Sequence, residues 1–190
     1  MNSFDKTINK ILSEVLLDTE YSTDPKSKKA ERVKFSFSDS SKEQSTKIGS
    51  VKGFDIYRKD TQFPKGISVA IYGVSDDIKI VIKSELLSSN TIRVKSLEAN
   101  ENNTLKADEL YHYLITSLGY AIISDTVQSV GGKMVWKKLF KYPDIKISYS
   151  IKGSNNWKEL PVDKREHYEV LWTSDEKSPR SDLILKAENV

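Results

Sequence analysis

Apolar and polar residues recur with two different periods along this chain, and the periods predict which segments are helices and which are strands. Between residues 3 and 18 the apolar side chains have helical spacing, which is typical of an amphipathic helix with Ser3 as its N-cap. The polar segment 21–31 contains Asp24-Pro25 and predicts a linker. The first helix is therefore either an ordinary packed helix or an arm that docks on the body or on a partner.

The middle of the chain alternates apolar with polar residues, which predicts β-structure. Segment 32–38 predicts a half-buried strand, and segment 47–59 predicts two short strands around Lys52-Gly53. Three further strands are expected at 66–74, 77–86 and 91–99. Because only short turns separate these three, they are expected to pair as antiparallel hairpins.

The period then changes to that of a helix. Segment 104–119 carries one apolar stripe, with Thr104 as the candidate N-cap and Gly119 as the candidate residue just after the helix. A short buried strand, 120–125, and a second helix, 131–143, follow. Further strands are predicted at 144–151 and 167–174, and 182–187 is either a last strand or a docked tail.

Composition narrows the classes of function. The chain has 190 residues, a net charge of +3, no cysteine and two histidines, His112 and His167. These counts exclude a thiolate metal site and a cysteine nucleophile, and no metal site is expected. Positive and negative residues are interspersed, so neither nucleic acid nor a membrane is an expected partner. The N-terminus lacks the pattern of a signal peptide, and the absence of cysteine fits a cytosolic protein.

Taken together, the predicted elements indicate an α+β fold with one central mixed, mostly antiparallel sheet and two packed helices. The order strand, strand, strand, helix, strand, helix, strand, strand from residue 66 resembles that of the GNAT N-acetyltransferases. Segments "SLEANENNTLKADELYHYLITSLGY" and "AIISDTVQSVGGKMVWKKLFKYP" are similar to the cofactor-binding part of that family. Within them, "ISDTVQSVGGKMVWKKL" resembles uncharacterised acetyltransferase-like bacteriophage proteins.

The resemblance covers about residues 66–172. Together with the pattern of the first 30 residues, it predicts an N-terminal helical arm and linker, 1–30, and a single GNAT-like domain, 31–190, with its core at about 66–172.

The resemblance implies a site for acetyl-CoA at the start of the helix 104–119. The residues matching the family's phosphate loop are Asn102, Asn103, Thr104, Leu105, Lys106 and Ala107. Glu98 and Asp125 match positions where a base would assist an acyl transfer. In the family the loop is rich in glycine, because glycine lets the backbone N–H groups approach phosphate.

Here the loop contains no glycine, and Lys106 is its only cation. Asp108 and Glu109 in the first helical turn would stabilise the helix but repel pyrophosphate. The later helix has Trp136 where many members of the family have a tyrosine acid.

Each candidate residue also has a purely structural interpretation. Asp125 is expected to cap a turn, with a role as general base as the alternative. Glu98 is expected to be an exposed carboxylate at the end of a strand. Gly131-Gly132 permits a tight entry into a helix or forms an anion-binding nest. His112 is expected to be a surface residue, and His167 is expected to have a structural role. Trp157 lies in a polar segment, so an exposed indole there would indicate a contact surface.

These observations favour a binding or structural protein over an enzyme. We expect a GNAT-like domain with a degenerate cofactor loop and no cofactor, located in a virion or in the host cytoplasm. A protein partner is expected, with the helix 3–18 and the loop around Trp157 as candidate contacts. One alternative is an active acetyl-CoA-dependent N-acyltransferase. The other is a host-directed inhibitor of a bacterial defence protein.

Overall fold

The computed structural model describes residues 42–61, 66–72, 78–99, 104–125, 130–164 and 183–190. The predicted helix 3–18, the linker, and the predicted strands 32–38 and 167–174 lie outside these residues. The described elements are β1 (Thr46–Val51), β2 (Phe54–Thr61), β3 (Gly66–Tyr72), β4 (Ile78–Leu86), β5 (Thr91–Ala99), α4 (Ala107–Thr116), β6 (Ala121–Ile123), α5 (Val130–Leu139), β7 (Ile145–Ile151), β8 (Lys158–Glu159), the 3-10 turn η1 (Val162–Lys164) and β9 (Leu183–Asn189).

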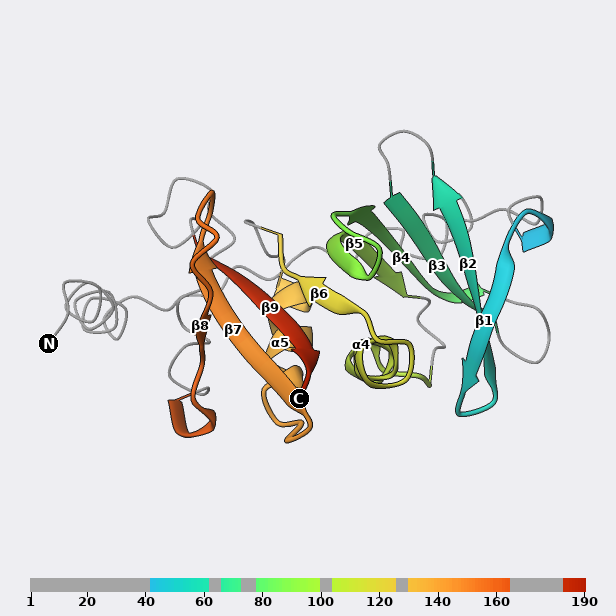
Figure 1. The fold of residues 1–190 in the computed structure, drawn as a ribbon. Helices are drawn as coiled ribbons and strands as arrows, with labels where there is room; N and C mark the ends of the chain where they lie inside the picture. The colour runs from blue at the N-terminus through green and yellow to red at the C-terminus, as the bar shows by residue number, and fades with distance from the viewer. Residues whose placement is uncertain (1–41, 62–65, 73–77, 100–103, 126–129, 165–182) are drawn as a thin grey trace, which may run out of the picture.

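The described strands form one nine-stranded sheet in the order β1-β2-β3-β4-β5-β6-β9-β7-β8. Every neighbouring pair is antiparallel except β5 and β6, which are parallel and are joined through α4. The described residues are therefore α+β, with a mostly antiparallel sheet and the two helices predicted after it begins, α4 and α5 (Figure 1). The last segment of the chain is an interior strand, because β9 lies between β6 and β7.

Local patterning accounts for most element boundaries. The five strands β1 to β5 occur where alternation predicted them, and adjacent strands pair as hairpins. The turn between β1 and β2 is made by Lys52 and Gly53, which both have positive φ, 49° and 80°. Two successive residues of positive φ are what a tight hairpin turn needs, and glycine tolerates that conformation best.

The start of α4 differs from the prediction. The N-cap is Lys106 rather than Thr104, which is exposed and lies two residues before it. The Glu109 side chain supplies the capping contact, since its Oε2 accepts a hydrogen bond from the Lys106 backbone N–H at 3.1 Å. This is the contact that the fourth residue of a capping box makes, while the Lys106 side chain makes no N-cap hydrogen bond of the kind expected from Thr104. After the helix, Gly119 adopts the expected left-handed conformation, with φ of 70°.

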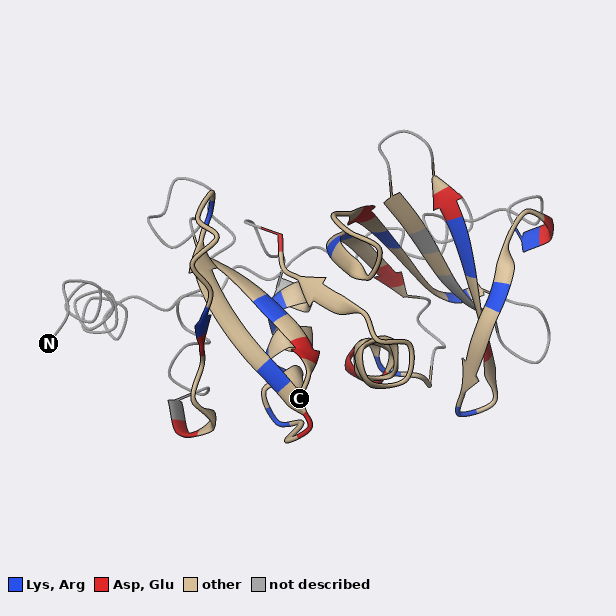
Figure 2. Ribbon diagram, in the orientation of Figure 1, with Lys and Arg blue, Asp and Glu red and all other residues tan. Residues whose placement is uncertain are grey.

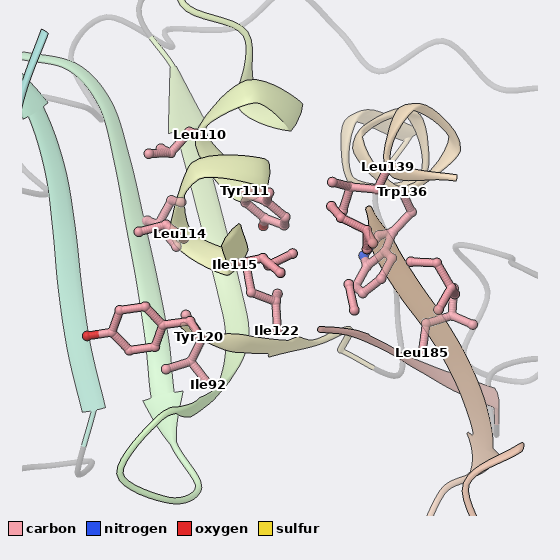
Figure 3. Packing of buried hydrophobic residues seen from close by; sticks show 14 of the residues in the cluster. Ile92, Leu110, Tyr111, Leu114, Ile115, Tyr120, Ile122, Trp136, Leu139 and Leu185 are labelled. Atoms are coloured by element: carbon pink, nitrogen blue, oxygen red, sulfur yellow. The ribbon is translucent and has the colours of Figure 1, made fainter. Parts of the chain in front are cut away.

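The core lies between the two helices and one face of the sheet (Figure 3). The predicted stripe of α4 supplies four buried residues, α5 contributes Trp136 and Leu139, and Phe140 directly after α5 is buried as well. Ile92, Ile122 and Ala187 occupy successive strands on the face that these helices cover. The core also takes in Ile56 and Leu185, outside the range 66–172.

Candidate functional site

The parallel pairing of β5 with β6 is short. The two strands separate at the carboxyl end of β6, and the carboxyl ends of parallel strands commonly hold ligands. Three residue pairs join them, from Thr91↔Ala121 to Arg93↔Ile123. Beyond Arg93, β5 continues to Ala99, and no other described strand pairs with it on the β6 side. We call this place the β5–β6 junction.

The N-terminus of α4 follows β5 and is the predicted cofactor-binding segment. Asn102 and Asn103 lie outside the described residues. Thr104 is exposed, Leu105 is buried in the core, and Ala107 begins the helix. A leucine side chain therefore fills the space beneath this turn.

A carboxylate of the protein itself occupies the positive end of α4. Glu109 accepts the Lys106 N–H, and its Oε1 lies 2.7 Å from Lys52 Nζ in the turn between β1 and β2. The hydrogen bond from Lys52 lowers the pKa of Glu109, together with the Lys106 N–H and against the opposing effect of burial. Since carboxylates are stabilised near helix N-termini, Glu109 fills the role that a bound anion would fill.

The structure does not bring the two candidate bases together at one point. Glu98 lies near the end of β5, opposite Val81 of β4, and is half-buried. Asp125 lies two residues beyond Ile123, whereas Glu98 lies five residues beyond Arg93, the register partner of Ile123. A difference of three residues corresponds to about 10 Å along a strand. Asp125 instead contacts Lys95, with Oδ1 3.5 Å from Nζ.

Four charged side chains meet at the β5–β6 junction. Arg93 Nη1 and Lys95 Nζ lie 3.4 and 3.6 Å from Glu85 Oε2 of β4. These contacts are longer than the 2.7 Å ion pairs elsewhere in the described structure, such as that of Lys52 with Glu109. The sequence analysis singled out neither cation. In the sequence, the available indication of this group was that Arg93 and Lys95 lie on the predicted strand 91–99 and that Asp125 ends the predicted strand 120–125.

A second polar cluster joins α4 to the end of α5, and sequence analysis missed it as well. Asp108 is 6% exposed, with Oδ1 3.3 Å from Lys138 Nζ and Oδ2 accepting a hydrogen bond from Tyr142 Oη at 3.2 Å. The Tyr142 ring stacks on His112, with ring centroids 4.3 Å apart, and His112 Nε2 lies 2.8 Å from Asp144 Oδ2. The signal for this cluster was the spacing of Asp108 and His112, one helical turn apart beside the apolar stripe.

We call this group, which consists of Asp108, His112, Lys138, Tyr142 and Asp144, the helix-joining cluster. Its contacts connect α4 to α5 and to the segment that follows α5. Burial, and then the nearby Asp108 carboxylate, raise the pKa of Tyr142 to about 12, so its hydroxyl stays protonated near neutral pH. His112 was expected on the surface, but its side chain is 29% exposed and is engaged with Tyr142 and Asp144. Its charged and aromatic neighbours therefore give it a structural role.

The remaining candidates have structural contacts. Ser124 is buried, and its Oγ accepts the Leu185 N–H at 2.9 Å, which ties β6 to β9. Trp157 directly precedes β8 and is partly buried, with Lys186 Nζ 5.3 Å from its ring centroid. Trp136 belongs to the core.

Charge is spread over the molecule rather than gathered on one element (Figure 2). In the described ranges no three His, Asp or Glu side chains are grouped so as to hold a metal ion. None of the described helices is long and apolar enough to cross a membrane. No family model, curated protein or solved structure matches the chain.

Proposed function

We propose that this protein is a binding or structural protein built on a GNAT-like domain whose cofactor loop is degenerate. The proposal includes a phage-type origin and a protein partner. It locates the protein in the virion or in the cytoplasm of an infected host.

The observation that carries the proposal is the closed N-terminus of α4. A pyrophosphate at this position would need backbone N–H groups and a local positive field. The Lys106 N–H is already bonded to Glu109, and the neighbouring Asp108 carboxylate is buried beside the same turn. An incoming phosphate would have to displace one carboxylate and approach another, so Coulomb repulsion opposes binding.

The order of elements supports the GNAT-like part of the proposal. β3, β4, β5, α4, β6, α5 and β7 follow the first seven elements of the order on which the resemblance rests, and the predicted eighth, the strand 167–174, lies outside the described residues. The parting of β5 from β6 lies where an acetyltransferase would need an opening. Trp136 lies in the core at 2% exposed and carries no acidic group. A binding protein needs no acid at that position, whereas many acetyltransferases have a tyrosine there.

Calorimetric titration with acetyl-CoA and coenzyme A tests this proposal. We expect no detectable heat and no thermal shift with either compound. Micromolar binding would overturn it. A Lys106→Gln variant, which removes the only cation of the loop, would then show whether the cofactor lies at α4.

One observation favours a second candidate, an acetyl-CoA-dependent N-acyltransferase. At the β5–β6 junction, the edge of β5 that pairs with no described strand could align an extended thioester arm, with Glu98 or Asp125 accepting a proton from the amine. Release of coenzyme A from acetyl-CoA in the presence of a protein, small-molecule or nucleotide amine would support this activity. Loss of that release in Glu98→Gln or Asp125→Asn would identify the base.

The binding role has two forms, which share the same surfaces. A virion protein should be found by mass spectrometry in purified particles. A host-directed inhibitor of a defence protein should be absent from particles and present early in infected cells.

A further inference from the structure

The two cations of the β5–β6 junction have fewer hydrogen bonds than their chemistry allows. Arg93 has five N–H donors, but its single side-chain hydrogen bond in the described structure is the 3.4 Å contact from Nη1 to Glu85. Its Nε is buried and has no hydrogen-bond partner among the described residues. A buried donor without an acceptor is destabilising, and a partner that supplies an acceptor would remove that cost.

A β-bulge directs the second cation to the same place. Ser84 pairs with Val94 and Lys83 pairs with Ser96, so Lys95 is an extra residue in β5. Bulges commonly re-aim a side chain beside a functional site. Here Lys95 Nζ lies 3.6 Å from Glu85 Oε2 and 3.5 Å from Asp125 Oδ1. Both distances are longer than the 2.7 Å between Lys52 and Glu109.

These features define the chemistry of a ligand. Arg93 offers a planar fork that matches a carboxylate, and Lys95 adds a point charge beside it. Glu85 and Asp125 balance the two cations, so the site has no net charge. A monoanionic carboxylate therefore suits it better than a dianionic phosphate, which would bring a second negative charge against two existing carboxylates.

The backbone next to these side chains indicates how the carboxylate is presented. Past Arg93, residues 94–99 of β5 have β4 on one side and no described strand on the other. Such an edge pairs readily with an extended peptide, whose side chains alternate between the two faces of the sheet. We propose that the β5–β6 junction binds an extended peptide of a protein partner, with one carboxylate of that peptide on Arg93 and Lys95.

This inference rests on the proposed binding function and names the chemistry of its partner. A blocked peptide of alternating Val and Thr with one central Glu provides the probe, and the same peptide with Gln in place of Glu is its control. The Arg93 Nε–H resonance of the full-length protein is followed by NMR at constant ionic strength. We expect the Glu peptide to shift this resonance and the Gln peptide to bind at least about tenfold more weakly, as expected for the loss of a charge-assisted contact.

Three variants locate the effect. Arg93→Gln should weaken binding of the Glu peptide at least about tenfold. Arg93→Lys, which keeps the charge without the fork, should restore only part of it. Lys152→Gln removes one positive charge from the exposed turn after β7, away from the β5–β6 junction, and should leave binding unchanged. Because the resonance is observed in the unmodified protein, the test stands even if an Arg93 variant fails to fold.

Several outcomes would overturn the inference. An unmoved Arg93 resonance would show that the site takes no carboxylate. Equal effects of acetate and the Glu peptide at matched carboxylate concentration would show a small-anion site without peptide pairing. A stronger response to inorganic phosphate would reverse the assignment of the ligand. A coenzyme A titration that shifts the Lys106 amide would refute the proposed function separately, because that amide reports on α4 and not on Arg93.

Discussion

Replacing Tyr142 with phenylalanine removes one hydroxyl and tests whether the helix-joining cluster is a structural clamp. Tyr142 Oη donates to the buried Asp108 carboxylate at 3.2 Å. Hydrogen bonds to charged groups contribute about 1.5–3 kcal/mol, and this one is long and only partly buried. We therefore expect Tyr142→Phe to lower the free energy of unfolding by about 1–2 kcal/mol. For a chain of this size that corresponds to a fall in Tm of about 2–8 °C.

Urea denaturation followed by circular dichroism measures this loss. A double-mutant cycle with Asp108→Ala isolates the contact, and we expect a coupling energy of about 1 kcal/mol. Tyr113→Phe is a matched control on the adjacent helix α4. Its hydroxyl has no hydrogen-bond partner in the part of the chain that the structure describes, so its effect should stay within about 0.5 kcal/mol.

The pH dependence of the difference provides a second check. The folded-state pKa of Tyr142, about 12, exceeds its ordinary value of 10.0 because of burial and the Asp108 carboxylate. The stabilisation from the protonated hydroxyl is therefore fully present below pH 10 and is lost as the pH rises toward 12. A coupling energy near zero, or a stability difference that already disappears between pH 7 and pH 9, would refute the clamp.

Two further predictions concern α4 and the tie between β6 and β9. The pKa of Glu109 is lowered by Lys52, so the stability lost in Glu109→Gln, about 1 kcal/mol, should be present above the ordinary pKa of 4.5. This loss of stability should disappear as the pH falls through the lower folded-state pKa of Glu109. Denaturation curves that give the same loss at every pH would contradict the prediction. Ser124→Ala leaves the buried Leu185 N–H without its acceptor and should cost about 1–2 kcal/mol. The exposed Ser117→Ala is its control, and equal thermal stability of the two variants would contradict the role of Ser124.

The candidate site was only partly predictable. The sequence placed Glu98 and Asp125 near the ends of neighbouring strands, but their separation depends on the register of β5 against β6. Asp108 looked like an ordinary helix-stabilising carboxylate, because its neighbour Lys138 is 30 residues away in sequence. Arg93 looked like one more charged residue on an amphipathic strand. Contacts between distant segments leave no local period, so no pattern could predict them.

Local periods along the sequence determined which segments become strands and which become the helices α4 and α5. They also determined the tight turn at Lys52 and Gly53, because those preferences act between residues close in the chain. Tertiary structure alone decided that β9 lies between β6 and β7, that β5 extends past its parallel partner, and that Glu109 closes the start of α4. These features depend on backbone hydrogen bonds and ion pairs between distant segments, which form only when burial of the shared core brings the segments together.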